Sequence, residues 1–104
     1  MATLERTQDV TINYRVDGDG DTTWLLLNGA TLPLEFWDPL ARALALRDTV
    51  VRFDQRNAGA TLAQGSFSLL DTAADAAAVL EHLGVKSVIV VGHDCGGRVA
   101  QVFA

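Results

Sequence analysis

The stretch KSVIVVGHDCGGRVAQVFA, residues 86–104, decides how this sequence folds. Its apolar run ends at Gly92, and such a run is typical of a strand buried on both faces of a parallel sheet. Small residues follow, and then a segment with helical spacing. Glycines at such a junction allow a strand and a helix to approach closely around one side chain. Residues 92–96, GHDCG, therefore match the pattern G-x-Nu-x-G of a nucleophile elbow, with Asp94 at the nucleophile position.

Other interpretations of this stretch fit its spacing less well. A dinucleotide-binding turn requires glycine at the third position, where the carboxylate of Asp94 would repel a pyrophosphate. A pattern centred on Cys95 would place His93 where a small residue is required, so Cys95 is expected to be a small buried side chain. Asp94 could also cap the following helix, because a carboxylate there complements the helix dipole. The glycines on both sides favour the nucleophile position.

The remainder of the chain predicts strands that alternate with helices. Apolar residues at every second position, and continuous apolar runs, predict strands over 10–16, 22–27, 49–54 and 86–92. Helical spacing predicts helices that start near Asp38 and at Ser68, the second ending at Gly84. DGDGD (17–21) predicts a turn. This alternation indicates an α/β fold, with a mostly parallel sheet and helices on both faces, as one domain over residues 1–104.

Ligands of such sheets collect at the carboxyl ends of the strands. Three segments follow the predicted buried strands: NGAT (28–31), DQRNAG (54–59) and GHDCGG (92–97). Because the carboxyl ends of parallel strands meet at one edge of a sheet, we expect these segments to form the functional site.

The composition excludes several classes of protein. The 104 residues are 49% hydrophobic and carry a formal net charge of −5, so we expect a folded domain that binds neither nucleic acid nor an anionic membrane. The single cysteine, Cys95, rules out an internal disulfide. No apolar segment approaches the roughly 18 residues of a membrane span, and the first ten residues do not resemble a signal peptide. We therefore expect a soluble, cytoplasmic protein.

Three motifs in this order resemble the α/β-hydrolase superfamily over essentially the whole chain. LLLNGATLPLEFWDPL (25–40) is similar to the strand and oxyanion loop of enol-lactone and ester hydrolases, and VVRFDQRNAGAT (50–61) is similar to the strand and loop that follow. GHDCGGR (92–98) is similar to the elbow of the aspartate-nucleophile branch, which includes haloacetate and haloalkane dehalogenases and epoxide hydrolases. The resemblance implies the N-terminal half of this fold, a partial core domain over residues 1–104.

The resemblance also implies roles for particular residues and a small-molecule substrate. It implies that no metal or cofactor takes part. In this interpretation Asp94 is the nucleophile, and oxyanion donors are the backbone N–H groups of Ala30 and Cys95. Possible pocket residues are Asn28, Gly29 and Trp37.

An aspartate at the elbow implies displacement at an sp³ carbon. A serine must lose its proton to a base before it attacks, whereas a carboxylate with a reference pKa of roughly 3.9 is already ionised at neutral pH. Attack on a carbon that bears a halide or an epoxide oxygen gives an alkyl ester of Asp94, which water then hydrolyses. Each donor aimed at the oxyanion of that second step typically contributes roughly 3 kcal/mol.

Two further interpretations stay open. The loop NGAT (28–31) stands where the aspartate branch usually has His-Gly-x-Pro, and it is nearer to the loop of serine hydrolases. The chain could therefore belong to a serine-type ester or lactone hydrolase lineage with an atypical elbow. It could also be a non-catalytic interaction module built on the same scaffold.

Other polar residues are expected to be structural. We expect His93 to pack or hydrogen bond rather than act as a base, His82 to lie on the surface, and Asp54 and Arg56 to stabilise the second loop. The orienting acid and the water-activating histidine of the superfamily are expected beyond Ala104, so these 104 residues alone should turn over little substrate. The apolar edge of the last strand is expected to pair with the missing C-terminal half or with a second copy.

Overall fold

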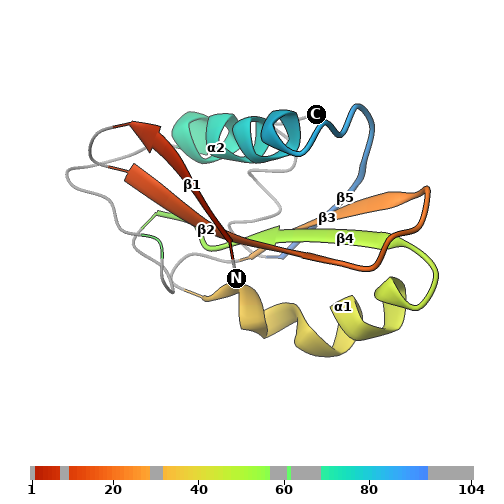
Figure 1. Ribbon diagram of the computed structural model, residues 1–104. Helices are drawn as coiled ribbons and strands as arrows, with labels where there is room; N and C mark the ends of the chain where they lie inside the picture. The colour runs from red at the N-terminus through yellow and green to blue at the C-terminus, as the bar shows by residue number, and fades with distance from the viewer. Residues whose placement is uncertain (1, 8–9, 29–31, 57–60, 62–68, 94–104) are drawn as a thin grey trace.

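The computed structural model describes residues 2–7, 10–28, 32–56, 61 and 69–93, which form a five-stranded sheet with a helix on each face. Figure 1 shows α1 (Asp38–Ala45) against one face and α2 (Leu69–His82) against the other. The strand order is β1-β2-β4-β3-β5. The strands are β1 (Ala2–Thr7), β2 (Val10–Asp17), β3 (Thr23–Leu27), β4 (Thr49–Phe53) and β5 (Ile89–Gly92).

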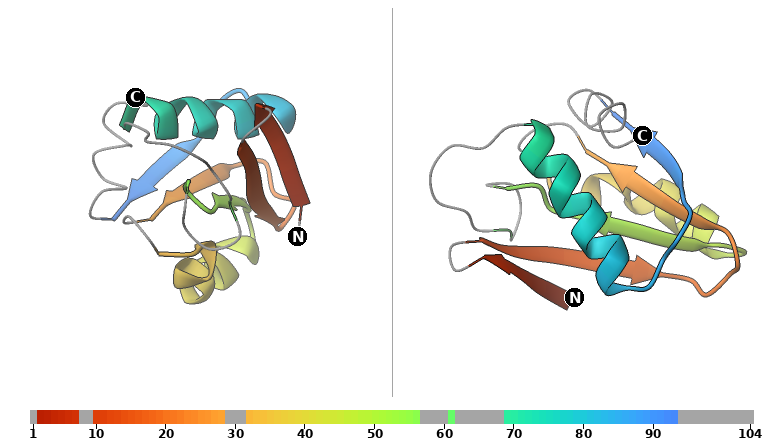
Figure 2. Two further views of the ribbon diagram at one scale, coloured as in Figure 1. Left: turned by 90° about the vertical axis from the view of Figure 1, so that its left-hand side faces the viewer. Right: turned by 90° about the horizontal axis from the view of Figure 1, so that it is seen from above.

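The parallel part of the sheet is built by two crossovers. β3 pairs in parallel with β4 and with β5, so that Leu25 lies opposite both Val51 and Val90. The chain passes from β3 to β4 through the 3-10 helix η1 (Leu34–Trp37) and α1, and from β4 to β5 through α2. The two connections cover opposite faces of the sheet (Figure 2). The predicted α/β fold, with a mostly parallel sheet and helices on both faces, is confirmed.

The N-terminal hairpin extends the sheet beyond what the sequence pattern predicts. β2 confirms the strand predicted over 10–16, and it pairs antiparallel with β4 and with β1. β1 was not predicted, because Leu4 is the one large apolar side chain in its six residues. Its register with β2 shifts between Glu5 and Thr7, an irregularity of the kind that is common in edge strands.

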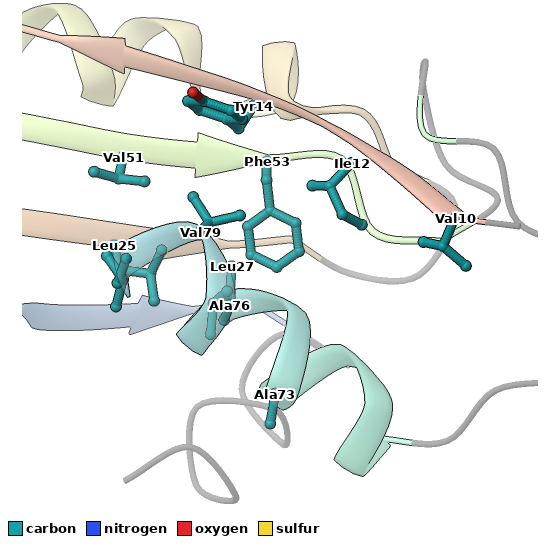
Figure 3. Close-up of a cluster of buried hydrophobic side chains, with 11 residues drawn as sticks. Val10, Ile12, Tyr14, Leu25, Leu27, Val51, Phe53, Ala73, Ala76 and Val79 are labelled. Carbon is teal, nitrogen blue, oxygen red and sulfur yellow. The ribbon is translucent and has the colours of Figure 1, made fainter. Parts of the chain in front are cut away.

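The larger hydrophobic core lies between the sheet and α2 (Figure 3). Leu27 and Phe53 point from the sheet toward α2, which presents Ala73 and Ala76 to them. Alanine favours the helix and its small side chain allows the helix to approach the sheet closely. Truncating a buried side chain such as that of Leu27 typically costs about 2–5 kcal/mol, so this core holds α2 and the sheet together.

A smaller core lies between the sheet and α1. Leu26 and Val50 pack against Trp37 and Ala41. α1 begins at Asp38 as predicted, with a proline in its first turn, where the missing N–H costs no hydrogen bond.

The turn after β2 is in direct contact with the loop that precedes β4. Gly18 has a φ of +77°, and a Cβ there would lie 2.0 Å from the carbonyl oxygen of Asp48. The Thr49 hydroxyl donates a hydrogen bond to the Gly20 carbonyl oxygen at 2.7 Å. Only glycine fits at position 18 without moving the neighbouring backbone, and the predicted turn is confirmed.

α2 ends at a glycine, as predicted. Gly84 has a φ of +74°, its N–H donates to the Glu81 carbonyl oxygen at 3.0 Å, and the Val85 N–H donates to that of Leu80 at 2.9 Å. These two bonds form a Schellman motif, which ends the helix and turns the chain toward β5. The predicted N-cap, Ser68, lies outside the described residues. No helix among those described is long and apolar enough to cross a membrane.

Candidate active site

Three strands end side by side at one edge of the sheet, as the sequence predicts. β3 leads into Asn28, β4 into Asp54 and β5 into His93. The right-hand view of Figure 2 shows these three strands running in the same general direction. The His93 N–H donates to the Leu27 carbonyl oxygen at 3.0 Å. The parallel pairing of β5 with β3 therefore continues to the residue before Asp94.

Most of the predicted site residues lie outside the part of the chain that the structure describes. These are the predicted nucleophile Asp94, the predicted oxyanion donors Ala30 and Cys95, and the possible pocket residue Gly29. The structure describes the segments that flank them, which end at Asn28 and at His93.

Asn28 is fully buried, and its amide contacts the loop that follows β3. Its Nδ2 donates to the carbonyl oxygen of Leu32 at 2.9 Å and to that of Pro33 at 2.5 Å. The Gln55 Nε2, from the segment after β4, donates to the Asn28 carbonyl oxygen at 2.6 Å. The Asn28 Oδ1 is buried and accepts no hydrogen bond from the described residues. Asn28 therefore connects β3 to the far end of the loop and to β4.

Two aromatic rings from η1 pack against His93. The Phe36 ring centroid lies 4.9 Å from that of His93, and the Trp37 centroid lies 6.4 Å from it. Trp37 is 9% exposed and packs in the smaller core, whereas Phe36 is 42% exposed. The role of Trp37 as a pocket residue stays a prediction, and Phe36 is the more accessible of the two rings. The ring contacts agree with the packing role expected of His93.

Asp54 acts as a structural acceptor at the end of β4, in agreement with the expectation from the sequence. Its Oδ1 accepts a hydrogen bond from the Leu34 N–H at 2.6 Å, and its Oδ2 accepts one from the Asn13 Nδ2 at 2.8 Å. One carboxylate thus ties the end of β4 to η1 and to β2.

Arg56 forms the other structural contact expected of the second loop, and its partner is in α2. Its guanidinium contacts the buried carboxylate of Asp75 through Nε at 2.8 Å and Nη2 at 3.1 Å. Arg6 of β1 donates to the same carboxylate at 3.0 Å. The hydrogen bonds to Asp75 raise the pKa of Arg56 above its ordinary value, despite the opposing effect of burial. Asp75 shares a helix face with buried Thr72 and Val79, and that spacing could have revealed its burial.

Arg52 was missed as a structural residue, because β4 was treated as a uniformly apolar strand. Its guanidinium is buried and donates to Asp38 at 2.6 Å, to Asp17 at 2.7 Å and to the Leu34 carbonyl oxygen at 3.0 Å. The hydrogen bond from Arg52 lowers the pKa of Asp38, despite the opposing effect of desolvation. A single arginine within an otherwise apolar strand is the feature of the sequence that could have indicated a buried, paired charge.

His82 lies on the surface, as predicted. It is exposed near the C-terminal end of α2, with its ring 6.0 Å from that of Tyr14 in an edge-on contact. It takes no part in the edge of the sheet where Asn28 and His93 meet.

Comparison with known proteins agrees with this fold. Residues 24–104 match the family described as alpha/beta hydrolase fold. A protein assigned as a carbamate hydrolase, RutD, of Caulobacter segnis is 35% identical over 99 residues, which cover 89% of this chain and 37% of that protein. A fluoroacetate dehalogenase of a Burkholderia species is 35% identical over 102 residues, which cover 92% of this chain and 33% of that protein.

A solved structure assigned as an epoxide hydrolase of Pseudomonas aeruginosa superposes with a TM-score of 0.88 at 31% identity, over 98% of this chain and 35% of that one. A mostly parallel α/β sheet in which β4, β3 and β5 lie side by side, with a helix on each face, is the fold of this class of protein. The chain belongs to the α/β hydrolase fold family. It spans about a third of the length of the curated relatives that it matches.

Proposed function

We propose that Asp94 is the nucleophile of a hydrolase that acts on a carbon bearing a halide or an epoxide oxygen. The observation that carries the proposal is the hydrogen bond from the His93 N–H to the Leu27 carbonyl oxygen. It joins the residue before Asp94 to the end of β3, where the predicted oxyanion loop begins. A strand-to-helix elbow at this edge is where the fold family carries its nucleophile. The similarity to a fluoroacetate dehalogenase and an epoxide hydrolase supports a carboxylate there.

The proposed reaction has two steps. A carboxylate oxygen of Asp94 forms a bond to the substrate carbon, and the bond from that carbon to the halide breaks, with the electron pair leaving on the halide ion. With an epoxide, the pair stays on the opened ring oxygen, which takes up a proton. Water then adds to the aspartyl ester carbonyl, and cleavage releases the alcohol with one original oxygen of Asp94. The carboxylate regains its second oxygen from water.

The oxyanion of the second step forms on the aspartyl carbonyl itself. We propose that the N–H groups of Ala30 and Cys95 donate to it, each contributing roughly 3 kcal/mol to that step. The His93 ring, packed against Phe36 and Trp37, then positions the backbone that precedes the nucleophile.

The test measures halide release and isotope uptake in the natural full-length protein. Single turnover with fluoroacetate or chloroacetate in ¹⁸O-labelled water should place one ¹⁸O in the peptide that contains Asp94. Asp94→Ala should abolish halide release, and Asp94→Asn should lower it by at least 10³-fold, on the order of the loss of a covalent nucleophile. The matched control, Asp19→Ala, removes an exposed acid from the turn after β2 and should leave the rate unchanged. Label in the product instead of the peptide would overturn the proposal.

A second candidate is hydrolysis at a carbonyl carbon, as in esters, lactones or carbamates. The relative assigned as a carbamate hydrolase and the loop that begins at Asn28 favour it. In this case Asp94→Ser should create or raise cleavage of 4-nitrophenyl acetate, whereas a carboxylate-based dehalogenase should gain nothing from the change. If the natural protein processes neither class of substrate, the interaction-module interpretation is favoured over both.

A further inference from the structure

Resting on the proposed hydrolase function, we infer that Asn28 is a positioning residue for the predicted oxyanion loop. Its side chain hydrogen bonds across the loop, from the end of β3 to the two carbonyl groups of Leu32 and Pro33. The residues between these ends include Ala30, the predicted oxyanion donor. A single side chain therefore sets the separation between the ends of the segment that would carry that donor.

The chemistry of the contact requires an amide. An Nδ2 group carries two hydrogens, and here it faces two carbonyl oxygens, at 2.9 Å and 2.5 Å. A carboxylate of the same shape offers no donor and would repel both oxygens, while an alanine offers neither contact. The Gln55 Nε2 fixes the backbone of Asn28 from the other side, at 2.6 Å from its carbonyl oxygen. Asn28 is thus held between β4 and the loop.

The burial of Asn28 indicates that its side chain does more than fill space. Its Oδ1 is buried with no hydrogen-bond partner among the described residues, which typically costs about 1–3 kcal/mol. An apolar side chain would avoid that cost if filling the space were the only requirement. The two Nδ2 bonds are the gain for which this cost is tolerated.

Loss of the two bonds should act on the rate of reaction more than on substrate binding. A displacement of about 1 Å in a catalytic group can lower a rate by about 10²-fold, and loss of one oxyanion donor lowers kcat by about 10²–10³-fold. We therefore expect Asn28→Ala to lower kcat for halide release by about 10²-fold, with KM changed by less than about threefold.

The experiment uses the natural full-length protein with fluoroacetate, and compares Asn28→Ala, Asn28→Asp and the control Val79→Ala. Val79 is fully buried in the core between the sheet and α2, so its truncation reports the effect of general destabilisation. The carboxyl introduced by Asn28→Asp can donate one hydrogen bond when protonated and none when ionised. Its activity relative to Asn28→Ala should therefore fall as the pH rises through the pKa of that carboxyl.

The ratio of the activity of Asn28→Asp to that of Asn28→Ala separates the titration of the introduced carboxyl from the titration of other groups. The described charged or titratable groups on the segments next to Asn28 are Glu35, Asp54, Arg56 and His93, and they, like Asp94, are common to both variants. An Asn28→Asp variant no more active than Asn28→Ala at any pH between 4 and 8, or an equal loss of kcat in Val79→Ala, would overturn the inference.

Amide hydrogen exchange gives a readout that does not depend on activity. Asn28→Ala should raise exchange over residues 29–32 and leave the amides of β4 unchanged, whereas Val79→Ala should not raise exchange over 29–32. If the natural protein releases no halide but the exchange result holds, the proposed function fails and the loop contact stands. If the natural protein releases halide but Asn28→Ala does not change the exchange of the loop, the inference about Asn28 fails and the proposed function stands.

Discussion

Arg52 and Asp75 are buried charges on opposite faces of the sheet, and each has two partners of opposite charge. Arg52, on the α1 face, lies between Asp17 and Asp38, whose side chains are 22% and 31% exposed. Asp75, on the α2 face, lies between Arg6 and Arg56, whose side chains are 28% and 13% exposed. The two clusters have the same composition, one buried charge with two partners of opposite charge, and the signs of charge are reversed.

The difference between the clusters lies in what remains when the central charge is removed. The acids around Arg52 both reach solvent and can be hydrated without it. Arg56 is mostly buried, so loss of Asp75 would leave a cation with little access to water. Because an uncompensated buried charge is far more costly than an exposed one, the cluster on the α2 face should contribute more to stability.

Their pH responses also differ in direction. The pKa of Asp38 is lowered by the hydrogen bond from Arg52, so its contribution is present above the ordinary carboxyl pKa and is lost as the pH falls through the lowered value. The pKa of Arg56 is raised by Asp75, so its contribution is present below the ordinary arginine pKa and would be lost only in strong alkali. Of these two pKa shifts, only that of Asp38, on the α1 face, makes stability sensitive to acid, and only below about pH 4.

The largest effect is expected for Asp75→Asn, which keeps the shape of the side chain and removes its charge. We expect the free energy of unfolding to fall by about 3 kcal/mol, because Arg56 is left mostly buried without its hydrogen-bonded counter-charge and only the coulombic attraction of Asp71 remains. Chemical denaturation measures this, with Glu81→Gln, an exposed acid of the same helix, as the isosteric control. A loss below about 0.5 kcal/mol, the size expected of a surface substitution, would mean that the cluster on the α2 face does not contribute more to stability than the cluster on the α1 face.

A smaller loss is expected for Arg52→Met, which fills a similar volume without charge. We expect about 1–2 kcal/mol, because Asp17 and Asp38 regain water while the Leu34 carbonyl oxygen loses a donor. Arg42→Met is the control, since Arg42 is exposed and lies 4.0 Å from Asp38. If Arg52→Met lowers the free energy of unfolding more than Asp75→Asn does in the same assay, the exposure of the partner side chains does not determine how much each cluster contributes to stability.

The smallest effect is the acid dependence of the α1 face. The stability gap between the wild type and Arg52→Met should narrow as the pH falls below about 4, because Asp38 takes up a proton in both proteins. Denaturation midpoints between pH 7 and 3 measure the gap, and Arg42→Met should show little change across the series. If the difference in stability between the wild type and Arg52→Met does not change with pH, the ion pair between Arg52 and Asp38 does not contribute to the acid dependence.

The central strands and both helices follow from local sequence patterns. The apolar run of β3 reflects burial on both faces of the sheet, and Gly84 marks a helix end that only a residue tolerant of positive φ can form. β1 could not be found in this way, since an edge strand needs few apolar side chains. Its existence depends on pairing with β2, which is a long-range property.

For the candidate site, the sequence predicts which strand ends come together, and glycine spacing predicts Asp94 as the nucleophile, which stays a prediction. The contacts of Asn28 could not be predicted, because its hydrogen bond to Leu32 joins the two ends of a loop and no periodicity encodes it. The sequence predicts the helix only from near Asp38 and names Trp37 as the possible pocket residue, whereas Phe36 and Trp37 both lie in η1, which has three residues per turn and presents neighbouring side chains differently from an α-helix. Which of the two rings is accessible therefore follows from the structure alone.

The contact of Gly18 with the Asp48 carbonyl oxygen has a consequence for protein engineering. Chain segments are normally inserted at loop tips that carry no tertiary contacts. Here the β2–β3 connection is interlocked with the segment before β4 through backbone atoms, and Thr49 adds a further bond to Gly20. A tag or an inserted domain at this tip should therefore disturb two connections at once, although the tip is exposed and looks permissive.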